Sequence, residues 1–132
     1  MEIRRLSPAD VPGVMRLCEA EGWPSFTADA ARTLRILTAP GVTTMVAVDD
    51  DGSVAGFAEM FSDGELQAYL ALLAVDAAHR GAGIGRRLVT EALREAGGER
   101  IDTLSEDDAA GFYRSFPHFV KPGFRIYPFH QG

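Results

Sequence analysis

Residues 71–88 read ALLAVDAAHRGAGIGRRL, and this stretch decides the fold. The apolar run at its start is typical of a central strand that is covered on both faces. Glycines at alternate positions, Gly81, Gly83 and Gly85, then make a turn, and apolar residues at helical spacing continue over residues 84–96. The stretch therefore predicts a buried strand, a glycine-rich turn and an amphipathic helix in succession.

The glycine-rich turn is suited to holding an anion. Glycine has no Cβ, so the backbone N–H groups of the turn can face inward and approach a ligand closely. The N-terminus of the following helix adds unpaired N–H donors and a partial positive charge, and together they suit a pyrophosphate. Two other phosphate loops fit less well. The chain has no Lys-Ser or Lys-Thr for a G-x-x-x-x-G-K-[ST] loop, and its spacing is G-x-G-x-G, not the G-x-G-x-x-G of dinucleotide-binding folds.

The flanking sequence alternates between helical and extended patterns. On the N-terminal side we expect a strand at residues 1–6, a helix that Ser7 caps and that ends near Gly22, and a helix over residues 28–37 with Thr27 as its cap. Strands are then expected at residues 42–48, 53–61 and 65–75. On the C-terminal side we expect a strand at 100–104, a short helix at 107–115, and a final extended segment or hairpin at 120–129.

These elements predict an α/β fold class. We expect one domain over residues 1–132, with a mixed central sheet and the element order β-α-α-β-β-β-α-β-α-β. Its first half should be antiparallel, with a parallel crossover at the glycine-rich turn. The chain has 132 residues, 46% of them apolar and 24% charged, which is the composition of a globular domain.

Charge and cysteine content exclude several classes of function. The formal net charge is −6, which disfavours binding to nucleic acid or to an anionic membrane surface. Cys18 is the only cysteine, so no disulfide or cysteine cluster can form within the chain, and its place on an apolar helix face suggests a small buried hydrophobe. His79, His118 and His130 lack metal-ligand spacing, so we expect no metal. With no secretion signal and no apolar run of the ~20 residues that span a bilayer, a cytoplasmic protein is expected.

The segment Arg80-Gly81-Ala82-Gly83-Ile84-Gly85 resembles the R/Q-x-x-G-x-G/A motif of the GNAT superfamily of acyl-CoA-dependent N-acetyltransferases. The apolar strand before it, the helix after it and the downstream pair Phe112-Tyr113 are similar to the family as well. The expected element order agrees over essentially the whole chain. The alternative is a tight turn whose glycines serve packing alone.

The resemblance implies a site for acetyl-CoA. The backbone of the strand end would pair with the pantetheine arm, which requires the strand to splay from its neighbour, usually at a bulge. The N–H groups of the turn would hold the pyrophosphate, the Arg80 side chain would shape the turn, and Arg86 or Arg87 could reach the 3′-phosphate, although Arg87 fits a solvated helix face equally well. The implied cofactor-binding residues are Leu73, Ala74, Val75, Arg80, Gly81, Ala82, Gly83, Ile84, Gly85 and Arg86.

The resemblance also implies catalytic groups. Tyr113 is the candidate general acid for the CoA thiolate, and packing beside Phe112 is its alternative role. A backbone N–H near Leu73 or Ala74 is the expected oxyanion donor. No residue stands out as the general base: Glu59 and Glu65 are expected on strands beside the acceptor site, either as bases acting through water or as surface carboxylates.

Two departures from the family pattern bear on Tyr113. Many relatives carry an Asn shortly before this helix, whereas this chain has Ser105-Glu106-Asp107-Asp108. The family also tends to place Gly-Phe a few residues after the Tyr, whereas Gly123-Phe124 comes ten residues later.

Three aromatic residues are candidates for acceptor binding. Trp23 and Phe26 lie between the first two helices, where the family commonly builds its acceptor pocket, and an interface or core role is the alternative. Tyr69 stands where some relatives have a strand Glu.

The expected function is transfer of an acetyl group from acetyl-CoA to a primary amine of a small molecule or peptide, by direct attack in a ternary complex. Two alternatives remain: a GNAT-like module that senses acyl-CoA or binds a partner without catalysis, and a nucleotide-binding protein that uses the same turn. The absent base and the altered Tyr113 region keep the first of these open. No nucleic-acid or membrane partner is expected, and the sequence is compatible with a homodimer.

Overall fold

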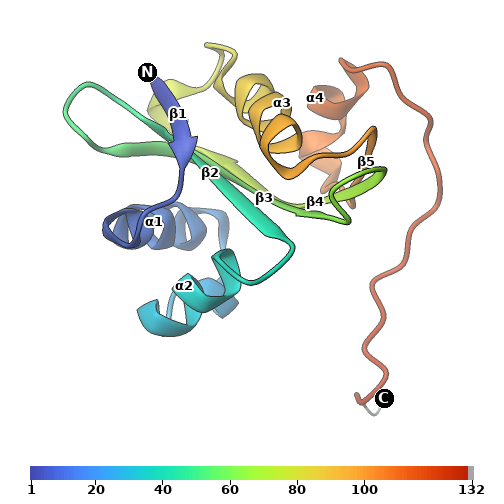
Figure 1. The fold of residues 1–132 in the computed structure, drawn as a ribbon, viewed down its shortest axis with the longest axis horizontal. Helices are drawn as coiled ribbons and strands as arrows, with labels where there is room; N and C mark the ends of the chain where they lie inside the picture. The colour runs from blue at the N-terminus through green and yellow to red at the C-terminus, as the bar shows by residue number, and fades with distance from the viewer. Residues whose placement is uncertain (131–132) are drawn as a thin grey trace.

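The computed structural model describes residues 1–130 and contains one five-stranded sheet with the order β1-β2-β3-β4-β5 (Figure 1). The strands are β1 Glu2–Arg5, β2 Val42–Val48, β3 Val54–Ser62, β4 Gln67–Val75 and β5 Arg100–Asp102. The first four pair antiparallel, and β5 runs parallel to β4. The predicted α/β class is confirmed, as is the change from antiparallel to parallel pairing.

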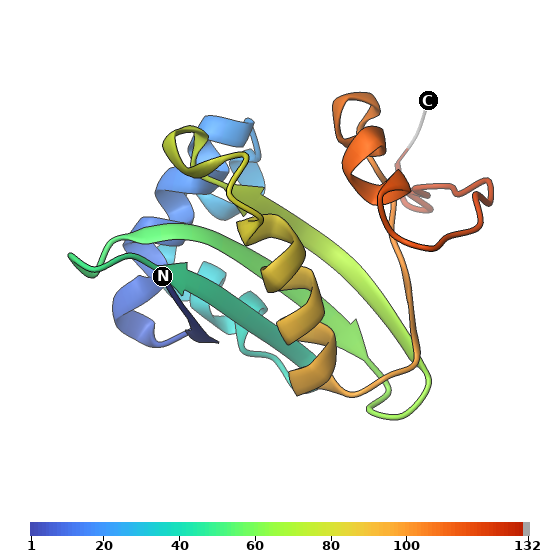
Figure 2. The same cartoon turned by 90° about the horizontal axis from the view of Figure 1, so that it is seen from above.

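Helices cover both faces of the sheet. The helices are α1 Val11–Glu21, α2 Ala30–Leu37, α3 Ile84–Ala96 and α4 Ala110–Arg114. Helices α1 and α2 lie on one face, α3 crosses the other, and α4 lies beyond the β4 side of the sheet (Figures 1 and 2). Among the described residues, no helix is both long and apolar enough to cross a membrane.

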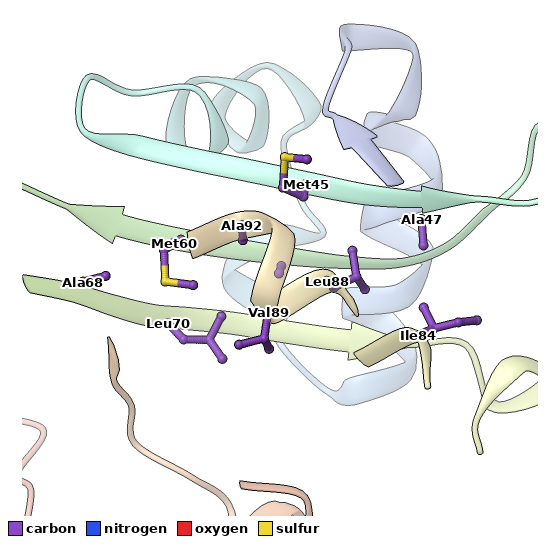
Figure 3. Close-up of a cluster of buried hydrophobic side chains, with 10 residues drawn as sticks. Met45, Ala47, Met60, Ala68, Leu70, Ile84, Leu88, Val89 and Ala92 are labelled. Atoms are coloured by element: carbon purple, nitrogen blue, oxygen red, sulfur yellow. The ribbon is translucent and has the colours of Figure 1, made fainter. Parts of the chain in front are cut away.

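Two apolar clusters form the core, one on each face of the sheet. On the α3 face, strand residues such as Met45, Met60 and Leu70 pack around Leu88 and Val89 (Figure 3). On the other face, side chains of β2, β3 and β4 pack against α1 and α2; this cluster includes Val14, Leu17, Cys18, Leu37, Val46, Phe57 and Ala74. Cys18 is fully buried there, as its place on the apolar helix face predicts.

A buried ion pair joins β1 to the start of α1. The carboxylate of Asp10 is 5% exposed and accepts hydrogen bonds from the Arg4 guanidinium at 2.7 and 3.0 Å and from the Ser7 backbone N–H at 2.8 Å. Burial alone would raise the pKa of Asp10, but these donors hold it below its usual value. Ser7 precedes a 3₁₀ turn, Pro8–Asp10, which leads directly into α1, and Gly22, with φ 78°, ends α1 as predicted.

Three local predictions are wrong. Thr27 does not cap α2: its hydroxyl donates to the Pro24 carbonyl, and the cap is Asp29, whose carboxylate accepts the N–H of Arg32 at 3.1 Å. Glu65 is not on a strand, because Asp63 accepts several backbone N–H groups and holds residues 63–66 as an exposed turn.

The third wrong prediction is the last strand. Residues 120–129 form no strand, and their large apolar side chains are exposed; Phe119, Phe124 and Phe129 are each more than 80% exposed. Pro122 and Pro128 have no backbone N–H to give to a neighbouring strand. The alternating apolar residues therefore pair with no strand in this structure.

One carboxyl group lies in the core. Glu59, in the middle of β3, is 2% exposed, and its Oε2 has no hydrogen-bond partner among the described residues. It alternates along β3 with Phe57, so it faces α1 and α2. Its cross-strand partner Thr44 donates to the Leu37 carbonyl of α2 on the same face. Burial raises the pKa of Glu59 to about 7.

A substitution at Gly56 tests how closely α3 packs on the sheet. A Cβ at this position would lie 2.9 Å from the Ala74 carbonyl oxygen and 3.0 Å from Leu88 Cδ1. We therefore expect Gly56→Ala to lower the free energy of unfolding by about 1–3 kcal/mol in urea denaturation. Gly111→Ala is the control, because a Cβ there meets nothing within 4 Å. Equal stability of the two variants would contradict this account of the packing.

Glu59 predicts a pH dependence of stability. Its folded pKa of about 7 lies above the ordinary value of 4.5, so the folded state holds this proton more tightly than the unfolded state. Stability should be highest below about pH 4.5 for this group and should fall by up to about 3 kcal/mol as the pH rises through 7. Glu59→Gln should remove that fall in denaturation curves measured from pH 5 to 8. Glu65→Gln, at an exposed turn residue, should retain it; loss of the fall in both variants, or in neither, would refute the assignment.

Candidate functional site

The two edges of strand β4 are paired over different lengths, and the unpaired part of one edge forms the candidate site. On one edge it pairs with β3 along its length. On the other, β5 pairs with residues 67–69 only. The register with β3 shifts between Glu59 and Met60, which face Leu72 and Leu70, so Ala71 is an extra residue in β4. Beyond Tyr69, the described structure has no strand on the second edge of β4, and the splay and the bulge expected from the sequence are both present.

The glycine-rich turn begins where β4 ends. Gly81 and Gly83 have φ angles of 84° and 79°, in the left-handed region that favours glycine. A Cβ at either position would meet nothing within 4 Å, so the space beside the turn is open. Gly85 has a different role, because a Cβ there would lie 3.2 Å from the Phe112 ring. Two glycines thus shape the turn, and the third permits α4 to pack on α3.

Backbone donors gather at the start of α3. The N–H of Arg87 donates to the Gly83 carbonyl at 3.1 Å, so the N–H groups of Ile84, Gly85 and Arg86 precede this helical hydrogen bond. The helix has no side-chain cap at Gly83. The arrangement provides several N–H donors together with the positive end of a helix dipole of thirteen residues.

The arginines around the turn have distinct partners. Arg80 Nε donates to the Val75 carbonyl at 3.1 Å, and its guanidinium pairs with Glu21 of α1 at 3.1 Å. The side chain therefore ties the turn to the end of β4, as expected. The guanidinium of Arg86 lies 4.0 Å over the Phe116 ring and donates to the Ser115 carbonyl, so it is turned toward the end of α4.

Tyr113 lies on α4, beyond the β4 side of the sheet. It packs against the α3-face cluster beside Phe112, with ring centroids 5.1 Å apart. Burial raises the pKa of its hydroxyl, a hydrogen bond with Thr103 lowers it, and nearby Tyr69 raises it further. Thr103, in turn, donates to the Leu70 carbonyl of β4 at 2.9 Å. The Tyr113 hydroxyl thus lies close to the point where the two strands separate.

The remaining candidates fall into separate places. Glu59 lies beside the bulge, and Glu65 lies in the exposed β3–β4 turn. Trp23 packs edge-on against Phe57 at 6.5 Å, and with Phe26 it borders the α1–α2 cluster. Tyr69 is instead paired with Phe61, with ring centroids 6.0 Å apart. The structure therefore does not bring Tyr69 together with the two aromatics of the α1–α2 loop.

Tyr69 and Phe61 line an open hollow of about 510 Å³ that sequence reasoning missed. It is formed by the turn before β2, the end of β3 and the start of β4, and its lining includes Pro40, Val42 and Asp63. These residues come from three segments, and no local motif links them.

No cluster suited to a metal ion occurs among residues 1–130. His79 lies 3.3 Å from Asp76 and 3.7 Å from Asp49, which joins the glycine-rich turn to the β2–β3 turn.

Comparisons with known proteins agree with this geometry. The family model described as an acetyltransferase (GNAT) domain matches residues 40–116, which contain the sheet from β2 onward, the glycine-rich turn and Tyr113. The uncharacterized N-acetyltransferase YhbS of Escherichia coli strain K12 is 36% identical over 118 residues, covering 80% of this chain and 68% of that protein.

Solved structures share the fold at lower identity. An aminoglycoside acetyltransferase, meta-AAC0020, from an uncultured soil metagenomic sample superposes with a TM-score of 0.77 at 24% identity, covering 98% of this chain and 96% of that one. A ribosomal-protein-alanine N-acetyltransferase of Brucella melitensis superposes with a TM-score of 0.76 at 17% identity, covering 98% and 100%. The family model and the E. coli relative together show that this chain belongs to the GNAT acetyltransferase family.

Proposed function

We propose that this protein is an N-acetyltransferase that transfers an acetyl group from acetyl-CoA to a primary amine of a small molecule or peptide within a ternary complex. One observation carries the proposal: the unpaired edge of β4 leads directly into the glycine-rich turn and the N-terminus of α3. An extended chain can add to such an edge, and a pyrophosphate fits the donors that follow it.

The proposed acetyl-CoA site uses mainly backbone groups. Leu73, Ala74 and Val75 would pair with the pantetheine arm along the open edge, and the N–H groups from Gly81 to Arg86 would hold the pyrophosphate. The open space beside Gly81 and Gly83 supports this fit. The Arg86 side chain already lies on Phe116, so its part in the site would come from its backbone N–H.

The proposed chemistry begins with a neutral amine, because an alkylammonium has no lone pair with which to attack. Glu59 is the group that we propose to receive the amine proton, through water, since its pKa of about 7 suits a base near neutral pH. Its burial requires such a relay. The Glu65 carboxylate is exposed in a turn and is not retained as a base.

Acetyl-CoA supplies an activated acyl carbon, and the new C–N bond forms there as the C–S bond breaks. A backbone N–H at Leu73 or Ala74 would donate to the carbonyl oxygen as negative charge develops on it. Tyr113 would then give its proton to the CoA thiolate, and its raised pKa keeps the phenol protonated for that role. One proton leaves the amine and one reaches the sulfur, so the products are an amide and free CoA.

Acetyl-CoA binding is tested by thermal unfolding. At 100 times its Kd, the ligand should stabilise the folded protein by about 2.7 kcal/mol and raise the Tm by several degrees. Gly83→Ala should weaken this shift, because a Cβ at φ 79° strains the turn. Gly52→Ala is a matched control at φ 87° in the β2–β3 turn, with the same open space around it. No Tm shift at millimolar acetyl-CoA in the unmodified protein would overturn the proposal.

Tyr113→Phe tests the proposed acid. The variant should lose about 10²-fold in kcat, measured as CoA thiol release on a panel of polyamines, aminoglycosides, amino acids and peptides. Its Tm shift with acetyl-CoA should be unchanged, because the ring and its packing remain. Tyr127→Phe, in the exposed C-terminal segment, should keep full activity. Unchanged turnover in Tyr113→Phe would show that another group protonates the thiolate, and a Tm shift with no thiol release on any amine would favour an acyl-CoA sensor.

A further inference from the structure

The hollow beside Phe61 and Tyr69 has an apolar aromatic wall that faces outward. The two residues are cross-strand partners on β3 and β4, and their rings are tilted by 32° with centroids 6.0 Å apart. Phe61 is 40% exposed, whereas every earlier residue of β3 is buried. Helix α2 ends at Leu37, before the turn residues that line the hollow. Such a pair offers two ring faces to an alkyl chain or to a cation.

The charge at the hollow is negative. Asp63 is the one charged side chain among its described lining residues. Its carboxylate accepts N–H groups from Glu65, Leu66 and Gln67, and these bonds lower its pKa, so it remains an anion. Around it, Glu65 and Asp102 are negative and Arg100 is positive; Arg100 and Asp102 are both bonded to the Gln67 side chain. The balance of these four groups favours a cationic ligand.

The hollow lies at the start of β4, and the proposed reacting centre lies further along the same strand. Tyr69 lines it and is also close to Tyr113. Asp63 is bonded to Gln67, and Leu70, where the strands separate, comes three residues later on β4, about 10 Å at the rise of a strand. A ligand that touches both ends must therefore be elongated.

We infer that the hollow binds the distal part of the amine acceptor, and that this acceptor is an elongated amine with a second cationic group about 10 Å from the nitrogen that is acetylated. The second cation would lie at Asp63, the connecting chain would lie on Phe61 and Tyr69, and the reacting nitrogen would reach Tyr113. This inference rests on the proposed function for the identity of the reaction, but the binding of a diamine in the hollow is a separate property.

The matched probes are 1,8-diaminooctane and octylamine, which have the same chain and differ in the second amine. Acetylation should show a KM about fivefold lower for the diamine. Asp63→Asn keeps a side-chain oxygen for the turn and should remove that preference with little change in kcat. Phe61→Ala should raise KM for both amines about tenfold. Asp51→Asn, at a similar turn carboxylate between β2 and β3, is the control and should retain the preference.

Direct binding separates this inference from the proposed function. Calorimetric titration of 1,8-diaminooctane into each variant, without acetyl-CoA, should give a Kd that rises in Asp63→Asn and Phe61→Ala and does not change in Asp51→Asn. Such binding, with no thiol release on any amine of the panel, would support the hollow and overturn the transferase proposal. Acetylation that is indifferent to Asp63 and Phe61, or absence of both binding and acetylation, would overturn the hollow as an acceptor site.

Discussion

The structure depends on the unequal pairing of β4. Its backbone groups are satisfied by β3 on one edge, but β5 leaves the sheet after three residue pairs. Side chains of Thr103 and Arg80 bond the carbonyls of Leu70 and Val75. The N–H and C=O groups between them on the second edge must then find partners in water or in a ligand. An open edge in the middle of a protein is normally a liability, because it can pair with other chains. Here α3 crosses one face of the sheet and α4 lies beyond its β4 side, so this edge has a helix on either hand (Figure 2).

The elements around the open edge of β4 are held in place by close packing. Gly56 allows Leu88 of α3 to lie against the middle of the sheet, and Gly85 allows Phe112 of α4 to lie against the start of α3. Thr103 closes the other end through its bond to the Leu70 carbonyl. Because these contacts fix α3 relative to β4, the N–H groups at the helix start have a defined direction before any ligand arrives. Such preorganisation lowers the cost of binding.

The parts of this arrangement that local sequence encodes were predictable. The glycines of the turn, the apolar run of β4 and the stripe of α3 each follow from residue type and spacing, and they led to the correct fold class. The burial of Glu59 was not predictable, because it is set by α1 and α2, which pack across the sheet from distant parts of the chain. The C-terminal segment shows the converse. Its alternating apolar residues have the pattern of a strand, but pairing needs a neighbouring edge, which a sequence pattern cannot supply.

Glu59 is the feature whose retention most needs a reason. An apolar side chain of similar size would fill the same place without the cost of desolvating a carboxylate, and a domain of this size has only a small margin of stability. Glu59 lies beside the proposed reacting centre. It is opposite the bulge of β4, on the same face as Phe61 and near the point where β5 departs. A carboxyl whose pKa is about 7 because it is buried is also one that can exchange a proton near neutral pH. The same burial that weakens the fold therefore gives the group its chemical value.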